Sequence, residues 1–323
     1  MKTIHWAMIG TGDVTEKKSG PGFYKAKNSV LYGVTNRTLA KAEDYAKRHH
    51  VEKVFASVDD LLADPKVDAV YIATPPGSHK DYALRCAEAG KVCYIEKPIA
   101  LTYNEALEIS EAFKKANVKA FVAYYRRTLP RFTEVKVLLD AGTIGDVRFV
   151  NVAYYRPAAK DEINGTHWHV QPEISGGGIF MDMAVHTLDI LDFFFGAIEK
   201  VAAFSVNQAG YYAPEDNVAL SFAFDNHITG TGNWCFTTDT VADTTQIVGS
   251  KGEINFGCFT NDPIQLKTAE QETAIPAGTI EHVHQNLIQT IVDELNGQGS
   301  CPSTIESALR TAWVCDQVYQ QQD

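Results

Sequence analysis

The sequence predicts an α/β protein that begins with a doubly wound parallel sheet of the Rossmann type and continues into a second domain of mixed strands and helices. Over the first 120 residues, short apolar runs alternate with amphipathic stretches, which requires crossover connections between parallel strands. A glycine-containing turn follows the first apolar run directly. After Tyr125 longer runs with a period of two take over, and a length of 323 residues suits two domains.

The first domain is expected to span residues 1–124. Two of its helices have marked starts, because Thr102 with Glu105 forms a capping box and Ser57 with Asp60 forms an acidic variant of one. The expected strands are Ile4–Ile9, Val30–Thr35, Val54–Phe55, Ala69–Ala73, Val92–Ile95 and Ala120–Ala123. The expected helices are Leu39–His50, Ser57–Ala63, Ser78–Ala89 and Thr102–Asn117.

The second domain is expected to span residues 125–323, with its C-terminal helix packed back on the first domain. Turn residues such as Asp225-Asn226 separate its strands, and Ser303 with Glu306 predicts a capping box at the last helix. The expected strands are Val147–Tyr155, Val201–Gln208, Val218–Phe224, Thr229–Phe236, Gln246–Val248 and Glu253–Phe256. The expected helices are Leu129–Ala141, Ile179–Phe195, His282–Leu295 and Ser303–Tyr319.

Composition excludes several classes of partner and location. A formal net charge of -11 without a long basic run argues against nucleic acid and anionic membrane surfaces as partners. The N-terminus lacks the features of a signal peptide, and no apolar run reaches the roughly 18 residues of a membrane span. The six cysteines are scattered without a C-x-x-C pair, which is typical of reduced thiols. We therefore expect a cytoplasmic protein whose cysteines bind no metal.

The turn after the first strand is typical of a dinucleotide site. Its sequence is Ile9-Gly10-Thr11-Gly12-Asp13-Val14-Thr15. Gly10 supplies the tight turn between strand and helix, and Gly12 lets the backbone approach a pyrophosphate. Thr15 replaces the third glycine of the fingerprint, and Pro21 interrupts the helix that follows. Because further strand–helix units come behind this turn, we interpret residues 10–14 as part of a cofactor site.

The end of the second strand indicates which dinucleotide binds. An acidic residue at this place would accept hydrogen bonds from the ribose of NAD. Here the residues are Asn36, Arg37 and Thr38, and the first acid is Glu43. Arg37 can pair with a 2′-phosphate, and Asn36 and Thr38 can donate hydrogen bonds to it. We therefore expect NADP(H) to be preferred, with NAD(H) possible, although Arg37 could also be a solvated surface residue.

Two other strand ends carry residues suited to a ligand site. Thr74 and Pro75, with His79 shortly after, follow the fourth strand at the carboxyl edge of the sheet, where open α/β sheets bind their ligands. Glu96 and Lys97 follow the fifth strand, and charges directly after a buried strand are costly unless they are paired or face a cleft. Lys97 is a candidate for polarising a substrate oxygen. The alternative is a strand that simply emerges into solvent.

One apolar helix of the second domain carries a polar stripe. Asp182, His186 and Asp189 stand at positions i, i+4 and i+7 of Ile179–Phe195, directly after Gly176-Gly177-Gly178. A carboxylate one turn from an imidazole can fix its tautomer and raise its pKa, as a general acid/base requires. The alternatives are a hydrogen-bonded core histidine and a metal site, for which no matched third ligand is evident. The pairs His167/His169 and His282/His284 are interpreted as incidental.

Along essentially its whole length the chain resembles the glucose–fructose oxidoreductase / inositol dehydrogenase (Gfo/Idh/MocA) family. The resemblance rests on Gly10-x-Gly12, Ala73-Thr74-Pro75, Glu96-Lys97-Pro98, Tyr125-Arg126-Arg127, Gly176-Gly177-Gly178, and Asp182 with His186. It implies that the second domain is an α/β domain with an open, mostly antiparallel sheet, often used for oligomerisation. It also implies sugars, polyols or related substrates. Long strands with apolar residues on both faces likewise predict a homodimer or homotetramer.

The resemblance also implies roles for individual residues. Lys97 matches the catalytic lysine of the family, and Asp182 and His186 match its substrate-orienting and acid/base pair. Cofactor contacts are implied at Gly10, Gly12, Arg37, Thr74, Pro75, Glu96 and Lys97, with Trp168 near the nicotinamide. Two positions depart from the family pattern: Ala184 replaces a glycine, and His169 replaces the arginine of a Trp-Arg pair, which puts that arginine's cofactor contact in doubt.

These observations lead to the hypothesis of an NAD(P)-dependent dehydrogenase or reductase acting on a secondary hydroxyl or keto carbon. His186 exchanges the hydroxyl proton, Lys97 holds the same oxygen, and Asp182 binds an adjacent hydroxyl. Weaker candidates for lining the substrate site are Arg126, Arg127, Tyr155 and Trp168. Two alternatives remain open: a redox-neutral enzyme with a tightly bound cofactor, and a binding protein that senses a sugar or cofactor.

Overall fold

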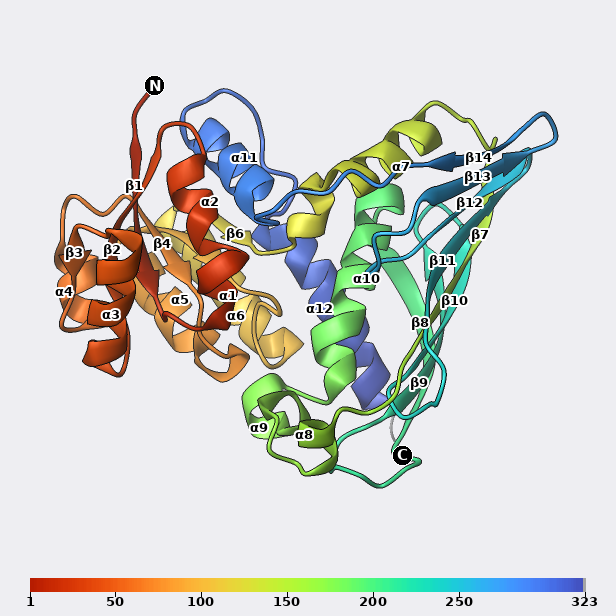
Figure 1. The fold of residues 1–323 in the computed structure, drawn as a ribbon, viewed down its shortest axis with the longest axis horizontal. Coiled ribbons are helices and arrows are strands. Elements are labelled where there is room, and N and C mark those ends of the chain that lie inside the picture. The colour runs from red at the N-terminus through yellow and green to blue at the C-terminus, as the bar shows by residue number, and fades with distance from the viewer. Residues whose placement is uncertain (322–323) are drawn as a thin grey trace. The chain divides into compact units, whose positions relative to one another are not determined.

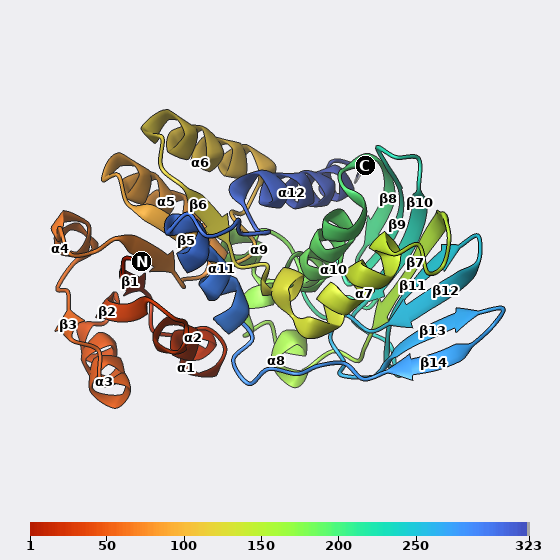
Figure 2. The same ribbon diagram turned by 90° about the horizontal axis from the view of Figure 1, so that it is seen from above.

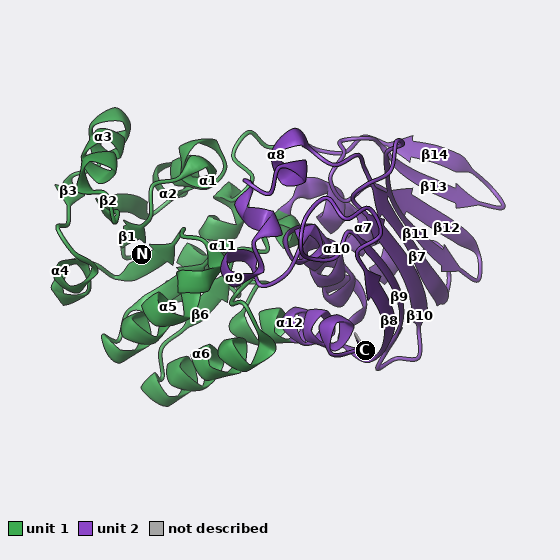
Figure 3. Ribbon diagram, turned by 90° about the horizontal axis from the view of Figure 1, so that it is seen from below, with its two compact units in different colours: residues 1–128, 280–309 green, residues 129–279, 310–323 purple. Residues whose placement is uncertain are grey.

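The computed structural model describes residues 1–321, which form two compact units (Figure 3). The first unit comprises residues 1–128 and 280–309, and the second comprises residues 129–279 and 310–321 of the described chain. The sequence-based division at residue 124 is a single cut, whereas the chain returns to the first unit at residue 280. Such a return leaves no trace in hydrophobic periodicity.

The first unit is built on a parallel sheet with the strand order β3-β2-β1-β4-β5-β6, which is the doubly wound order of a Rossmann fold. Its strands are β1 (Ile4–Ile9), β2 (Ser29–Thr35), β3 (Lys53–Val54), β4 (Ala69–Ile72), β5 (Val92–Ile95) and β6 (Ala120–Val122). Because helices bury the strands on both faces of the sheet, the strand sequences are nearly continuous apolar runs. Within the core, the ring centroids of Trp6 and Tyr71 lie 5.0 and 5.1 Å from that of Phe23.

The helices of the first unit begin where their caps predict. The Thr102 hydroxyl accepts a hydrogen bond from Glu105 N at 3.2 Å, and the Ser57 hydroxyl accepts one from Asp60 N at 3.0 Å. These helices are α1 (Asp13–Lys17), α2 (Gly20–Lys25), α3 (Leu39–His49), α4 (Val58–Ala63), α5 (His79–Glu88), α6 (Tyr103–Ala116) and α11 (Gln285–Leu295), with the short 3-10 helices η1 (Pro76–Ser78) and η2 (Tyr125–Thr128).

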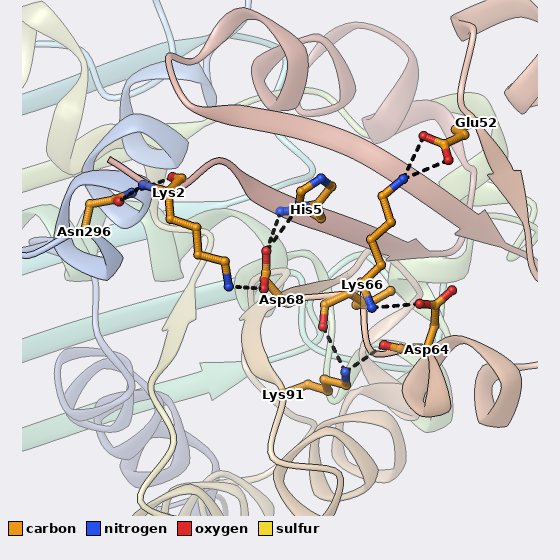
Figure 4. Close-up of polar contacts among 9 residues, drawn as sticks. Lys2, His5, Glu52, Asp64, Lys66, Asp68, Lys91 and Asn296 are labelled. Atoms are coloured by element: carbon orange, nitrogen blue, oxygen red, sulfur yellow. Dashed lines mark hydrogen bonds and ion pairs between the residues drawn. The ribbon is translucent and has the colours of Figure 1, made fainter.

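Helix α11 completes the core of the first unit although it comes late in the chain. Leu287 and Ile288 are fully buried, and a Cβ built on Gly22 of α2 would lie 2.7 Å from Ile288. At the end of the helix, the Asn296 side chain accepts from Lys2 N at 2.7 Å and donates to Lys2 O at 3.1 Å (Figure 4). The two contacts tie the end of α11 to the start of β1.

The second unit contains an eight-stranded sheet with the order β14-β13-β12-β11-β7-β10-β9-β8 (Figure 1). Its strands are β7 (Val147–Tyr155), β8 (Ile198–Val206), β9 (Asn217–Phe224), β10 (Thr229–Cys235), β11 (Ala242–Gly249), β12 (Gly252–Phe256), β13 (Ile264–Thr268) and β14 (Glu272–Ile275). Neighbouring strands are antiparallel except for β7 and β10. The expected mostly antiparallel sheet is therefore confirmed.

Helices cover one face of this sheet. Figure 2 shows α7, α10 and the end of α12 on the same side of the strands, while no helix among the described residues of the second unit lies on the other side. The helices are α7 (Pro130–Asp140), α8 (Lys160–Ile163), α9 (Pro172–Ser175), α10 (Ile179–Phe195) and α12 (Ile305–Gln320), with the 3-10 helix η3 (Trp168–Val170). No helix within residues 1–321 is long and apolar enough to cross a membrane.

Two details of the second half differ from the sequence-based expectation. Strands β13 and β14 were not predicted, because Pro263 and the polar run after Thr268 conceal their short alternating patterns. The Ser303–Glu306 capping box was wrong. Ser303 is fully buried and its hydroxyl donates to Val122 O at 2.7 Å, so Thr304, whose Oγ1 accepts from Ser307 N at 3.4 Å, caps α12 instead.

Candidate active site

The glycine turn after β1 has the geometry of a dinucleotide cradle. Gly10 has φ +96°, and a Cβ there would lie 2.7 Å from Ala73 O, so only glycine fits without strain. A Cβ on Gly12 would meet no atom of the described chain within 4 Å, which leaves the exposed backbone of this turn open to a ligand. Thr15 is buried and its hydroxyl donates to Gly12 O at 2.6 Å. The turn therefore fits a pyrophosphate group although the third glycine is missing.

The turn after β2 is joined to the glycine turn. Asn36 Nδ2 donates to Thr11 Oγ1 at 2.9 Å, and Asn36 Oδ1 accepts from Thr38 N at 2.9 Å. Arg37, between them in sequence, is exposed and forms no ion pair or hydrogen bond with any residue the structure describes. An unpaired guanidinium therefore lies beside the cradle, and the Asn36 side chain holds the two turns together.

His79, expected at the cofactor site, is completely buried. Its Nε2 lies 2.7 Å from Thr74 O, and its Nδ1 lies 2.9 Å from Pro98 O. Burial lowers the pKa of this imidazole below its usual value. The side chain braces the ends of β4 and β5 against each other, and both ring nitrogens face the backbone. Thr74 itself accepts a hydrogen bond from Ser78 Oγ at 2.8 Å, and Pro75 is exposed.

Glu96 anchors the backbone of Lys97 in a buried polar network. Its carboxylate accepts from Lys97 N at 3.2 Å and from the Tyr71 hydroxyl, and it lies 3.7 Å from His284 Nε2. The other ring nitrogen of His284 lies 2.9 Å from the Tyr94 hydroxyl. Burial raises the pKa of Glu96. Burial, together with the positive charges of Lys18, Lys97 and Arg126, lowers the pKa of His284 to about 3.

Sequence reasoning missed His284. It was interpreted as incidental, because its neighbours in sequence give no sign that the chain returns beneath β5. In the structure its ring packs 4.6 Å from that of Tyr125, and both nitrogens face polar groups of the strands. A neutral imidazole at this place supports Glu96 without placing a second positive charge beside Lys97.

Arg126 and Arg127, weaker candidates for the substrate site, are buried in the first unit. Arg126 donates to the Tyr125 hydroxyl at 3.0 Å, and Arg127 donates to Pro302 O at 3.0 Å. The second contact holds the returning segment before α12. Arg127 therefore has a structural contact that the sequence pattern did not suggest.

In the second unit, the triple glycine forms the turn that directly precedes α10. Gly176 has φ +85°, and the backbone N–H of Gly178 donates to both carboxylate oxygens of Glu215, at 2.9 and 3.1 Å. A Cβ on Gly177 would lie 2.3 Å from the Tyr319 hydroxyl, and one on Gly178 would lie 2.7 Å from Glu215 Oε1. The glycines are needed because these two side chains press against the turn.

Helix α10 carries the polar stripe that the sequence predicted. Asp182 is half-buried, His186 is 5% exposed and Asp189 is fully buried. The Asp182 carboxylate lies 3.5 Å from His169 Nε2, and the His169 ring packs 3.7 Å from that of Trp168. His169, which replaces the family arginine, therefore gives Asp182 a partner that carries charge only when protonated.

The loop after β12 lies beside His186. The ring of Phe259 is 6.1 Å from that of His186 in an edge-to-face arrangement, and it is 4.7 Å from that of Tyr154 at the end of β7. Phe259 is partly exposed, as is Tyr155, the expected pocket residue next to Tyr154. The sequence reasoning did not single out Phe259, because nothing near it in sequence links it to α10.

Among residues 1–321, no three His, Cys, Asp or Glu side chains are placed to hold a metal ion. The candidate groups divide between the units: Lys97 and the glycine turn belong to the first, and Asp182, His186, Trp168 and Tyr155 belong to the second. Each set is chemically coherent by itself. The first offers a dinucleotide cradle with a cation, and the second offers an imidazole with a carboxylate.

Comparison with known proteins assigns the chain to a family. The model of an oxidoreductase family with an NAD-binding Rossmann fold matches residues 4–124, and the model of the GFO/IDH/MocA C-terminal domain matches residues 132–255. The chain belongs to the Gfo/Idh/MocA family. The resemblance noted in the sequence is confirmed, and the protein is an oxidoreductase with an NAD-binding Rossmann domain.

Relatives of this Gfo/Idh/MocA oxidoreductase match almost its whole length. An oxidoreductase of Formosa agariphila is 37% identical over 320 residues, with 97% of each chain covered. The NAD-dependent scyllo-inositol 2-dehydrogenase of Bacillus subtilis is 29% identical over 280 residues, which cover 83% of this chain and 78% of that one. The crystal structure of an aldose–aldose oxidoreductase from Caulobacter crescentus matches with a TM-score of 0.88 at 20% identity, covering 99% and 97% of the two chains, and at that identity the likeness is one of fold.

Proposed function

We propose that this protein is an NAD(P)-dependent dehydrogenase or reductase that acts on a secondary hydroxyl or keto carbon of a sugar, polyol or related compound. The observation that carries the proposal is α10, a mostly apolar helix that places Asp182 and His186 one turn apart. The scyllo-inositol dehydrogenase among its relatives supports the substrate class.

The residues can divide the reaction between them. Oxidation of a carbinol removes a hydride from carbon and a proton from oxygen, and a bound nicotinamide would take the hydride at C4. His186 takes the hydroxyl proton onto a ring nitrogen and returns it in the reverse reaction. The ammonium group of Lys97 stabilises charge that develops on the oxygen, and Asp182 accepts a hydrogen bond from a neighbouring hydroxyl. Trp168, Tyr155 and the arginine pair are weaker contacts in this scheme.

We further propose that NADP(H) is preferred over NAD(H). The backbone of the cradle, residues 10–14, suits either dinucleotide, because both carry the same pyrophosphate. Support for the phosphorylated form comes from the guanidinium of Arg37, which is exposed beside that cradle and unpaired among the described residues. Residues 30–42 also contain no carboxylate that would repel a 2′-phosphate. Thr38 adds a hydrogen-bond donor, and Asn36 holds the turn in place.

The proposed function is tested by incubating the protein with each oxidised cofactor and a panel of inositols, pyranoses and open-chain polyols. The absorbance of the reduced nicotinamide is followed, and the reverse reaction is run with keto-sugars. We expect turnover with at least one polyol and an oxidised product in equal amount. An absence of cofactor reduction and of keto-sugar reduction across the panel would rule out this activity.

A further inference from the structure

We propose that Phe259 forms an apolar wall of the substrate site beside His186 and that this wall selects ring-shaped sugars and polyols over open-chain ones. The inference rests on the proposed function, because it takes His186 as the acid/base group. It goes further by naming the shape of the substrate.

The loop that carries Phe259 is fixed by a single carboxylate. Asp243 of β11 accepts hydrogen bonds from the backbone N–H groups of Cys258, Phe259 and Thr260, at 2.8, 2.6 and 2.7 Å. A Cβ on Gly257 would lie 2.7 Å from Asp243 Oδ2, so glycine is needed for the chain to close around the carboxylate. Charge-assisted hydrogen bonds of this kind are strong and hold the loop in one conformation.

The fixed loop gives Phe259 a defined place at the end of the sheet. Tyr154, which its ring contacts, belongs to β7 and pairs in register with Asp243 itself. The anchoring carboxylate, the aromatic wall and the end of β7 are therefore neighbours. The Phe259 ring also lies edge to face with that of His186, and it stays partly exposed.

An aromatic ring next to the acid/base group favours a particular ligand shape. Alternate axial C–H bonds of a pyranose or cyclitol chair point to the same side and form an apolar face, whereas its equatorial hydroxyls point outward. That face can pack on Phe259 while a hydroxyl reaches His186. An open-chain polyol has no such preformed face and must lose more conformational entropy to present one.

The experiment compares Phe259→Leu with Phe259→Tyr, because leucine keeps apolar volume without a ring and tyrosine keeps the ring. The probes are myo-inositol and D-glucitol, a cyclic and an open-chain polyol. KM and kcat are measured for both, together with the binding of each probe to the cofactor-loaded protein and the affinity for cofactor alone. Asp243→Asn, which removes the charge that pins the loop, serves as a second route to the same site.

We expect Phe259→Leu to raise KM for myo-inositol roughly 3- to 10-fold, the scale of an aromatic packing contact, with kcat, cofactor affinity and the D-glucitol constants little changed. Phe259→Tyr should retain the wild-type values, and Asp243→Asn should follow Phe259→Leu. An equal rise in KM for both probes would contradict the proposed role of Phe259. An unchanged KM for myo-inositol in both Phe259→Leu and Asp243→Asn would contradict it as well. Wild-type protein that turns over D-glucitol but no cyclic compound would overturn the wall and leave the proposed function standing. Wild-type protein that shows neither cofactor reduction with any compound of the panel nor reduction of keto-sugars would overturn the proposed function and this inference with it.

Discussion

At the scale of single residues, the proposed preference for NADP(H) depends on Arg37. We expect NADPH to bind at least about 10-fold tighter than NADH, because a charge-assisted contact contributes about 1.5–3 kcal/mol. Arg37→Ala should remove that advantage and barely change NADH binding, and added salt should reduce it. Calorimetric titration of both cofactors measures this. Lys47→Ala removes an exposed positive charge from α3 and is the matched control. Equal or tighter binding of NADH by the wild type would refute the preference.

The test of Lys97 is of a different kind, because its proposed catalytic role is at the reacting oxygen. Lys97→Ala should lower turnover by roughly 100-fold or more, as expected when a positioned electrostatic group is lost. Its backbone is held by Glu96 at 3.2 Å, so cofactor affinity should stay within a few fold. Steady-state kinetics together with a binding titration separate the two effects. Near-normal turnover would remove Lys97 from the mechanism.

At the scale of elements, α10 depends on the ionisation of Glu215. Burial first, and then the neighbouring charge of Asp216, raises the pKa of Glu215 to about 7 from its ordinary 4.5, although the Tyr319 hydroxyl and the Gly178 N–H both favour the charged form. The folded protein therefore holds this proton where the unfolded chain has already lost it. Between about pH 4.5 and 7 the free energy of unfolding should fall as pH rises, by an amount on the order of 3 kcal/mol.

Glu215→Gln cannot ionise and tests this directly. Its unfolding free energy should lack that decline, so the difference between wild type and variant should shift in favour of the variant as the pH rises from 4.5 to 7. Chemical denaturation at a series of pH values measures both curves. Parallel curves would mean that Glu215 keeps an ordinary pKa in the folded protein.

At the scale of the whole molecule, the face of the eight-stranded sheet without helices needs a cover. A hollow on that face is lined by outward-facing residues of β7 to β10, among them Phe149, Ser221 and Thr231, and Phe204 is 80% exposed. An apolar patch of this kind is typical of a subunit contact. We expect a homodimer or homotetramer that Phe204→Asp dissociates. Light scattering that finds a monomer of the wild type at micromolar concentration would contradict this.

The limits of sequence reasoning follow the same scales. The glycine turn and the stripe on α10 are local patterns, so spacing predicted the turn at Gly10 and the shared helix face of Asp182 and His186, whereas the roles expected of these residues came from the family resemblance. Contacts between distant parts of the chain could not be predicted, because His284 lies 188 residues from its neighbour Glu96, and Glu215 lies 37 residues from Gly178, whose N–H it binds. His79 was expected at the cofactor and instead binds two backbone carbonyl groups, since its position fixes proximity to the sheet edge but not the direction of its ring.

The central claim is direct hydride transfer from substrate carbon to an exchangeable cofactor, and one measurement tests it. A cyclic polyol that the protein oxidises is labelled with deuterium at its carbinol carbons, and the reduced cofactor is recovered and weighed by mass spectrometry. Each reduced cofactor should carry one deuterium, and His186→Ala should transfer little label in the same time because that variant turns over slowly. Oxidised product formed without deuterium in the free cofactor would contradict it.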